Sequence, residues 1–323
     1  MAEVRLGLIG AGRWGRRYIQ TLNEMPGVKL SRLASSNPAS ASLLPPDCTI
    51  TQDWKDVAAD QALDGIIIAT PPALHAPMAE VAIRAGIPVL VEKPMTLSLA
   101  EARRLVGLAE TTSCLVFVGH THLFSSAFRA LKQSALGLGV LRHIRSHGGN
   151  WGPYRPATPM LWDWAPHDIA MCLDLVGAEP IEVHARRTSS TALPDGDGEA
   201  IELKLDFPNG VRADIRVSNI DQKKNRYFEA QFAKGTLIYD DLSTDKLCIH
   251  MSSEEVLTPI PLDSSMSLSN LVTEFCNYIS AGCDTHESLG LGLRVIEVLH
   301  RSQQEIGTCA DAAFTSPFRT IAG

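Results

Sequence analysis

The sequence is poor in cysteine and in positive charge, and it has no long hydrophobic run. No apolar run approaches the roughly 20 residues of a membrane span, and the apolar run near the N-terminus is too short and too rich in glycine for a signal peptide. The cysteines are odd in number and widely scattered in a chain long enough to fold without disulfides, so we expect reduced thiols, as in the cytoplasm. No two of them have the C-x2-C spacing of a zinc site. The seven cysteines are Cys48, Cys114, Cys172, Cys248, Cys276, Cys283 and Cys309.

The charge balance excludes one class of partner. The 29 Lys and Arg residues are outnumbered by 36 Asp and Glu residues, which gives a net charge of -7. Such a chain does not favour nucleic acid or an anionic membrane surface. With 323 residues, 45% of them hydrophobic, it is long enough for two domains with sizeable cores. We therefore expect a small-molecule partner, no nucleic acid and no membrane.

Strand and helix patterns alternate in the first 120 residues. Compact apolar runs are separated by helical stretches, one of which has Ser98 as N-cap with Glu101 three residues on. Parallel strands buried on both faces require such crossover helices, so the pattern predicts a doubly wound α/β domain. The strands are expected at 4–9, 28–34, 65–69, 89–91 and 115–118, and the helices directly after residue 12 and at 73–85 and 99–109.

The pattern changes after about residue 120. Two alternating runs flank Pro208-Asn209-Gly210, which is typical of an antiparallel hairpin. Further strands are expected at 227–232 and 236–239, a polar loop at 188–198, and amphipathic helices at 268–281 and 289–306. The sequence thus predicts a first domain over 1–120 and a second, antiparallel domain over 121–323, with C-terminal helices that are free to pack back on the first domain.

Gly10-Ala11-Gly12-Arg13-Trp14-Gly15 matches G-x-G-x-x-G directly after a strand and at the start of a helix. Gly10 would permit the tight turn, Gly12 would let a pyrophosphate approach the backbone, and Gly15 would let helix and strand pack closely. The helix N-terminus offers unpaired N–H groups to phosphates. The motif predicts a dinucleotide site that includes Arg13 and Trp14; a glycine-rich structural turn is the alternative.

The end of the second strand bears on the choice of cofactor. NAD-selective sites usually have an acidic residue about 20 positions after the glycines, but here the chain reads Ala34-Ser35-Ser36-Asn37-Pro38. Ser35, Ser36 and Arg13 could donate to a 2′-phosphate, which favours NADP over NAD. Hydroxyl groups also serve a plain ribose, so both cofactors stay open.

Three more motifs follow in order, and they carry a family resemblance. They are Ala69-Thr70-Pro71-Pro72 with His75, Val91-Glu92-Lys93-Pro94, and Trp162-Asp163-Trp164-Ala165-Pro166-His167-Asp168. Together with the glycine loop, this set resembles the glucose-fructose oxidoreductase / inositol dehydrogenase (Gfo/Idh/MocA) family over essentially the whole chain. The resemblance implies a Rossmann domain and an α+β domain whose large, mainly antiparallel open sheet often forms oligomer contacts, hence a homodimer or homotetramer.

The resemblance also implies an activity. It is the reversible oxidation of a secondary alcohol of a sugar, sugar derivative or cyclic polyol, with hydride passing to C4 of the nicotinamide. Lys93 would contact both substrate and cofactor, and His167 would lie across the substrate with Asp163 beside it. The other residues expected at the cofactor are Ala69, Thr70, Pro71, His75 and Glu92.

The same three residues suit this chemistry on physical grounds. Removing hydride from a carbinol carbon requires a base for the hydroxyl proton, and histidine needs little tuning for that role. Asp163 and His167 are four apart, on one face of a helix if Trp162 begins it. Lys93 follows a strand at its carboxyl end, where an ammonium can polarise the oxygen. Which of His167 and Lys93 takes the proton stays open.

Two stretches outside the motifs are further candidates for substrate contacts. His120 follows the last strand of the first domain, where many relatives carry an Asn-Arg-Arg-like stretch; a structural role is the alternative. Trp151 and Tyr154 lie in a rigid, aromatic stretch before the Asp163 helix and could stack on a sugar face, or pack internally.

Other readings of these residues remain. Asp163 and His167 with His143 or His147 could ligate a metal, but no compact spacing such as H-E-x-x-H is present, and we expect no metal. A sugar hydrolase or lyase that oxidises its substrate transiently would use the same groups. A cofactor-binding sensor that has lost catalysis is the non-enzymatic alternative.

Overall fold

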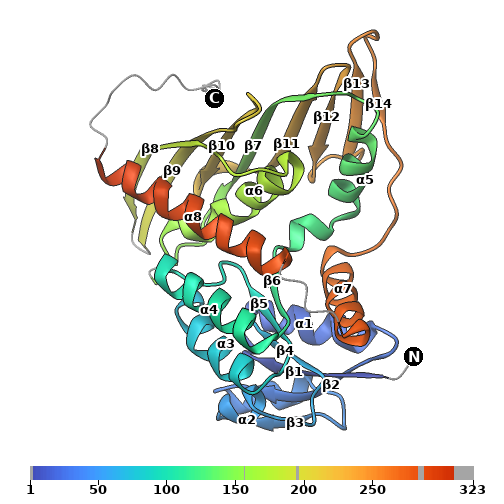
Figure 1. Cartoon of the computed structure of the whole chain (residues 1–323), viewed down its shortest axis with the longest axis vertical. Helices are drawn as coiled ribbons and strands as arrows, with labels where there is room; N and C mark the ends of the chain where they lie inside the picture. Colours follow the sequence, from blue (N-terminus) through green and yellow to red (C-terminus); the bar gives the residue numbers. More distant parts are fainter. Residues whose placement is uncertain (1–2, 156, 194–195, 283–286, 309–323) are drawn as a thin grey trace. The chain divides into compact units, whose positions relative to one another are not determined.

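The computed structural model describes residues 3–155, 157–193, 196–282 and 287–308, so Cys283 and Cys309 lie outside the described residues. The chain divides into two compact units (Figure 1). The first combines Met1–Phe124 with Ser265–Ile296, and the second combines Ser125–Ser264 with Glu297–Gly323. The first unit is therefore built from two separate stretches of chain, and the second of these stretches carries one whole C-terminal helix and the beginning of another. The five described cysteines are free.

The first unit contains a six-stranded parallel sheet in the order β3-β2-β1-β4-β5-β6. This is the strand order of a dinucleotide-binding fold, and the predicted doubly wound α/β architecture is confirmed. Its strands are β1 (Val4–Ile9), β2 (Val28–Ala34), β3 (Thr49–Thr51), β4 (Gly65–Ile68), β5 (Val89–Glu92) and β6 (Val116–Gly119). Its helices are α1 (Arg13–Glu24), α2 (Lys55–Ala58), α3 (His75–Arg84), α4 (Leu99–Thr112), α7 (Ser267–Ala281) and the start of α8 (Glu287–Thr308), with the short 3₁₀ helices η1 (Pro38–Leu43), η2 (Pro72–Leu74) and η3 (Thr121–Phe124).

Helices cover both faces of this sheet. On one face, α1 and α7 pack against apolar strand residues such as Leu8, Ile67 and Phe117. Gly65 in β4 allows this close packing, because a Cβ there would lie 2.8 Å from Ile279 Cδ1 of α7. On the other face, α2, α3 and α4 contact one another. The predicted cap of α4 is present, since Ser98 Oγ accepts a bond from the Glu101 N–H.

The second unit is built on an eight-stranded sheet in the order β14-β13-β12-β11-β7-β10-β9-β8. All neighbouring strands are antiparallel except β7 and β10, which are parallel. The predicted hairpin around Pro208-Asn209-Gly210 joins β9 and β10. The strands are β7 (Leu141–Trp151), β8 (Glu182–Leu193), β9 (Gly196–Asp206), β10 (Arg212–Ser218), β11 (Ile220–Phe232), β12 (Gly235–Asp240), β13 (Leu247–Met251) and β14 (Leu257–Pro259).

The prediction of a polar loop at 188–198 is wrong. β8 continues to Leu193 and β9 begins at Gly196, so most of this segment consists of the paired arms of a hairpin. Its side chains are largely exposed. A strand that is exposed on both faces needs no apolar face. Its sequence therefore lacks the alternation of apolar and polar residues on which strand prediction depends.

Helices α5 (Ser126–Ala135) and α6 (Met160–Val176) lie on one face of this sheet (Figure 1). The opposite face carries cross-strand pairs of unlike charge. Arg216 lies opposite Glu202, Asp214 opposite Lys204, and Arg212 opposite Asp206. Cross-strand pairs of this kind stabilise a sheet, and the charges of these three pairs are balanced within a single chain.

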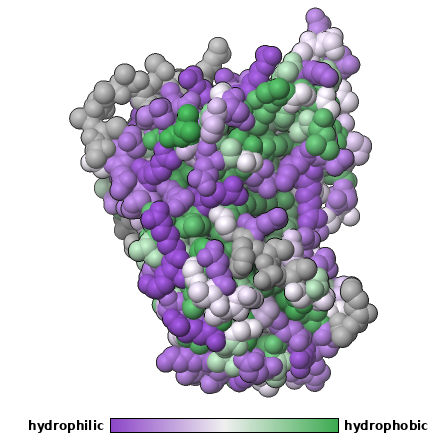
Figure 2. All heavy atoms as spheres, viewed as in Figure 1, coloured by the Kyte–Doolittle hydropathy of each residue, from purple (hydrophilic) through white to green (hydrophobic). Residues whose placement is uncertain are grey.

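No helix among the described residues is both long enough and apolar enough to cross a membrane. On the face shown in Figure 2, hydrophilic side chains predominate at the surface of each unit, with hydrophobic side chains showing between them.

Candidate cofactor and substrate sites

The glycine loop has the geometry that a dinucleotide requires. Gly10 has a φ of 100°, a left-handed conformation that favours glycine. A Cβ on Gly15 would lie 2.0 Å from Gly10 O, so only glycine fits there. A Cβ on Gly12 would meet nothing within 4 Å, so the backbone at Gly12 is open to a ligand. Gly12 is the N-cap of α1 and supplies no side-chain cap, which leaves the first-turn N–H groups available to phosphate oxygens.

The two serines after β2 differ in availability. The Ser35 hydroxyl is occupied locally, since it accepts a bond from the Asn37 N–H at 3.2 Å and lies 3.1 Å from Ser40 Oγ. Ser36 and Arg13 are exposed. Of the groups expected at the ribose, Ser36 and Arg13 are therefore the ones with side chains open to solvent.

Glu92 joins the strand that carries Lys93 to the glycine-loop helix. Its carboxylate is buried and accepts bonds from Trp14 Nε1 and from the Tyr18 hydroxyl, the latter at 2.6 Å. The backbone N–H of Lys93 donates to Glu92 Oε2 at 3.2 Å. Burial raises the pKa of Glu92 despite these donors. Trp14 and Tyr18 are one helical turn apart on α1, so two turns of this helix are fastened to the carboxyl end of β5.

His75 joins two further loops of the same edge. Its buried ring lies between two carbonyl oxygens, with Nδ1 2.9 Å from Pro94 O and Nε2 2.8 Å from Thr70 O. Burial lowers the pKa of His75. His75 thus lies between the two loops that the sequence assigns to the cofactor, after β4 and after β5, and its neutral ring donates to one of the two carbonyl oxygens.

His120 and Lys93 follow neighbouring strands in register. Glu92 pairs with Gly119 across β5 and β6, so the residues that directly follow the two strands are Lys93 and His120. His120 is 2% exposed, and neither ring nitrogen has a hydrogen-bond partner among the described residues. Burial, with the nearby Lys93 charge, lowers the pKa of His120 to about 3. His120 is therefore neutral at physiological pH.

In the second unit, helix α6 carries the other motif residues. It begins at Met160, two residues before Trp162. Asp163 is buried and bonded to Arg155 Nη1 at 3.0 Å, and His167 is half-buried one turn later. The next residue, Asp168, is 1% exposed; it accepts a bond from Ser146 of β7 and lies 3.7 Å from Arg226 Nη1. Asp168 anchors the helix to the sheet and so fixes the position of His167.

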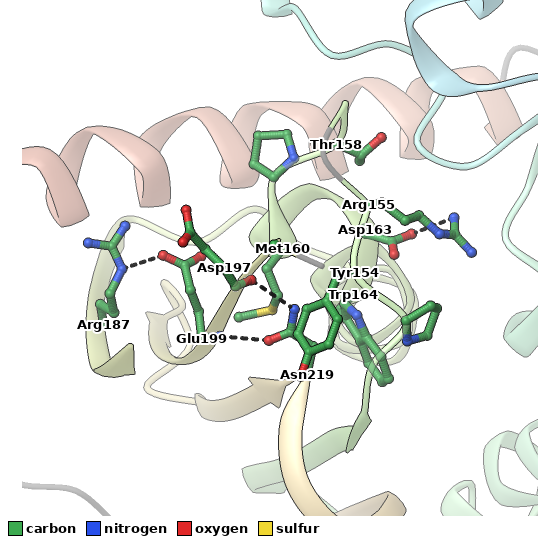
Figure 3. A pocket seen from close by; sticks show the side chains of 13 residues that line it. Tyr154, Arg155, Thr158, Met160, Asp163, Trp164, Arg187, Asp197, Glu199 and Asn219 are labelled. Atoms are coloured by element: carbon green, nitrogen blue, oxygen red, sulfur yellow. Dashed lines mark hydrogen bonds and ion pairs between the residues drawn. The ribbon is translucent and has the colours of Figure 1, made fainter. Parts of the chain in front are cut away.

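A cavity of about 290 Å³ opens beside Asp163 in this unit (Figure 3). Tyr154 lines it, as the sequence suggested for a substrate residue. Trp151 does not; it ends β7 with 55% of its surface exposed. The lining residues are Pro153, Tyr154, Arg155, Thr158, Pro159, Met160, Asp163, Trp164, Arg187, Gly196, Asp197, Glu199 and Asn219.

The residues considered for a metal have other partners. His143 Nε2 lies 2.7 Å from Asp214, and His147 Nε2 lies 2.8 Å from Asp221, both on the sheet. The group of potential ligands that lie close together in the described part of the chain is instead Glu182, His184 and Asp206, at the sheet edge. Asp206 is bound to Arg212 there, at 2.7 Å.

The roles of several of these residues were not predicted from the sequence. Tyr18, Glu199 and Asn219 belong to no motif, because their partners lie far away in the chain or in a different strand. Arg155 follows Tyr154 in the aromatic stretch before the Asp163 helix and received no role, although its partner Asp163 is close in the chain. Asp168 was inside the quoted motif but received no role. Its position directly after His167, on a largely buried helix, was the available signal: a buried carboxylate needs a partner.

The fold and the glycine loop define a two-unit, dinucleotide-binding protein. Two family models extend this: the oxidoreductase family with NAD-binding Rossmann fold matches residues 4–120, and the GFO/IDH/MocA C-terminal domain matches residues 129–238. The chain belongs to the Gfo/Idh/MocA family of oxidoreductases.

Individual relatives agree with this assignment. A protein of Magnetospirillum magnetotacticum MS-1 named as an oxidoreductase is 41% identical, with a TM-score of 0.87 over 93% of this chain and 99% of the other. UDP-N-acetylglucosamine 3-dehydrogenase of Acidithiobacillus ferrooxidans is 27% identical over 73% of this chain and 77% of that protein. Inositol 2-dehydrogenase of Acidiphilium cryptum is 28% identical over 66% of this chain and 67% of that protein.

Proposed function

We propose that this enzyme transfers hydride reversibly between C4 of a nicotinamide and a secondary alcohol or ketone of a sugar, sugar derivative or cyclic polyol. The observation that carries the proposal is the occurrence, in one chain of this family, of an open glycine loop, Lys93 at the carboxyl end of β5, and Asp163 and His167 one turn apart on α6. The names of two relatives, which act on an amino-sugar nucleotide and on inositol, support the substrate class.

The side chains divide the work of alcohol oxidation. As the C–H bond gives up its hydride, the hydroxyl oxygen loses its proton and becomes a carbonyl. His167 takes that proton as general base, and Asp163 holds a substrate hydroxyl or the imidazole in place. The Lys93 ammonium stabilises the oxygen as negative charge develops on it. Exchange of the proton roles of His167 and Lys93 is the alternative assignment. His120, Tyr154 and Trp151 contact the substrate.

The cofactor is NADP rather than NAD in this proposal. Residues 34–38 supply no carboxylate that would repel a 2′-phosphate, and the exposed Ser36 and Arg13 can donate to one. Gly10, Gly12, Trp14 and Gly15 surround the pyrophosphate, with Ser35 beside the ribose. The edge residues Ala69, Thr70, Pro71, His75, Glu92 and Lys93 complete the cofactor site. A bound nicotinamide supplies the hydride chemistry that no protein side chain offers.

The assembly is a homodimer or homotetramer formed through the face of the sheet that α5 and α6 leave open. The cross-strand charge pairs on that face support this proposal, because a second copy meets a surface whose charges are already paired.

The function is tested by incubating the protein with NAD or NADP and a panel of sugars and inositols while following the near-ultraviolet absorbance of the reduced nicotinamide. His167→Ala is expected to lower kcat by about 100-fold or more while nucleotide affinity, measured by calorimetry, is kept. His184→Ala, an exposed histidine of the same unit, is the matched control. A fully active His167→Ala enzyme would refute the assigned role. Release of a leaving group without net cofactor reduction would instead indicate a hydrolase or lyase.

A further inference from the structure

The cavity beside Asp163 has a volume of about 290 Å³ and is lined by many residues to which the proposed reaction assigns no role. We infer that it binds a second ring of the substrate, so that the enzyme acts on a glycoside whose second ring carries no negative charge. This inference rests on the proposed function, since it takes Asp163 and His167 as the residues at the ring that is oxidised.

The position of the cavity along α6 separates it from the reacting carbon. Met160, Asp163 and Trp164 line it, and these residues occupy the first turns of the helix (Figure 3). His167, one turn further on, is not among the lining residues. A group that fills the cavity therefore lies on the side of Asp163 that faces away from His167. It belongs to a part of the substrate that does not react.

The lining offers a sugar ring both stacking and hydrogen bonds. Tyr154 and Trp164 present aromatic surface, which packs against the C–H faces of sugars. Tyr154 is held by close glycines, because a Cβ on Gly196 would lie 3.3 Å from Tyr154 Cβ and a Cβ on Gly198 would lie 3.4 Å from its Cε1. The Tyr154 hydroxyl is buried and has no hydrogen-bond partner among the described residues. A ring hydroxyl would satisfy it.

The far wall of the cavity is rigid. Asn219 is 3% exposed; its Oδ1 accepts a bond from the Glu199 N–H at 2.6 Å, and its Nδ2 donates to Asp197 O at 3.4 Å. These bonds fix the start of β9, from which Asp197 and Glu199 face the cavity (Figure 3). A cavity of about 290 Å³ is at the lower end of the range for small-molecule sites, which suits one ring rather than two.

Charge selects among the rings that would fit. The lining contains three carboxylates and two guanidinium groups. Both guanidinium groups are already bound to a carboxylate, Arg155 to Asp163 at 3.0 Å and Arg187 to Glu199 at 2.5 Å. Asp197 makes no ion pair within the described ranges, and the surplus charge is negative. A phosphate or carboxylate on the second ring would be repelled, whereas hydroxyl and amino groups are accepted.

The experiment compares free rings with their glycosides. Glucose, N-acetylglucosamine and myo-inositol are assayed with NAD and NADP beside cellobiose, chitobiose and the galactoside of myo-inositol. The matching sugar phosphates and UDP-N-acetylglucosamine form the anionic arm. We expect kcat/KM for at least one glycoside to exceed that for its free ring by about tenfold or more, as for other substrate groups that fill a pocket. We expect no such gain for the anionic compounds.

Substitutions of cavity residues test whether the preference for a glycoside arises in this cavity. Trp164→Leu removes the stacking surface, and Asp197→Phe fills the cavity from an exposed position. Each should bring the ratio of glycoside to free-ring kcat/KM close to one. Asp245→Asn changes an exposed carboxylate elsewhere in the same unit and should keep the ratio of the unchanged enzyme. Melting temperatures establish that each variant is folded.

The outcomes distinguish failure of the inference from failure of the proposed function. Turnover of a free ring with no advantage for any glycoside, or a preference for the anionic compounds, would overturn the inference and leave the function intact. Calorimetric binding of a glycoside that is lost in Trp164→Leu, without any reduction of NAD or NADP, would support the cavity assignment and overturn the function.

Discussion

At the residue scale, the buried His120, which has no hydrogen-bond partner in the part of the chain that the structure describes, makes stability depend on pH. Because the pKa of His120 is lowered to about 3 from 6.5 in the unfolded chain, the unfolded state takes up a proton as the pH falls below 6.5 and the folded state does not. This unequal uptake destabilises the fold between these two values.

His120→Gln removes this titration. Between about pH 7 and about pH 5, the wild-type protein should lose roughly 2 kcal/mol more unfolding free energy than the variant. The measurement is urea unfolding at each pH, with His184→Gln as the control for an exposed histidine. Equal losses in wild type and His120→Gln would contradict the buried, neutral state of His120.

At the residue scale, the residues that could be identified from the sequence are those that lie in a contiguous motif. Glu92, Lys93, Asp163 and His167 are in that class. Tyr18 could not be identified in this way, because its significance comes from a partner that only the fold brings near. Tyr18 lies 74 positions from Glu92 in the chain, and nothing about an isolated tyrosine in a helix indicates a carboxylate at its hydroxyl.

The glycine loop and α1 give a prediction at the scale of an element. Gly12→Ala adds a methyl group in open space, so stability should change little, whereas the methyl blocks the approach of a pyrophosphate. Gly15→Ala places its Cβ against Gly10 O and should destabilise the unit by about 3 kcal/mol or more. Thermal unfolding and calorimetric titration with NADP separate the two. Retained NADP affinity in Gly12→Ala would show that the loop does not hold the phosphates.

The end of β2 gives a second prediction at this scale. Ser36→Asp supplies the acceptor that NAD-selective sites use and repels a 2′-phosphate. The ratio of NADP to NAD affinity should fall by about tenfold or more, equivalent to about 1.4 kcal/mol. Calorimetry with both cofactors measures it, and Ser42→Asp, on the nearby η1, is the control. An unchanged ratio would mean that the ribose lies elsewhere.

Strands whose buried positions carry several large apolar side chains, such as β1, β2, β9 and β10, were predicted, whereas β7 was not. β1 and β2 begin and end where the sequence placed them. β7 was missed, because Ile144 is the one large apolar side chain among its buried residues, and the other buried positions carry Ser146, Gly148 and Gly149. The prediction for residues 188–198 was wrong for a related reason, since the exposed arms of this hairpin have the polar composition of a loop.

At the scale of the whole molecule, the open face of the second sheet predicts an oligomer. Light scattering at the concentrations used for activity should give the mass of a dimer or tetramer. Lys204→Glu places a further carboxylate beside Glu202, Asp206 and Asp214 and should favour the monomer. Lys234→Glu, at the turn between β11 and β12, is the control. A monomeric wild-type protein would contradict this assembly.

The assembly of the first unit from two distant stretches has a consequence for synthesis. The core between α1 and the first sheet also contains Leu271, Val272 and Phe275 of α7. These three residues leave the ribosome only after the entire second sheet has been synthesised. Until then, the nascent nucleotide-binding sheet exposes the apolar surface that α7 later covers, including Phe117. Chains truncated before residue 265 should therefore aggregate or recruit chaperones even though every strand of that sheet is present.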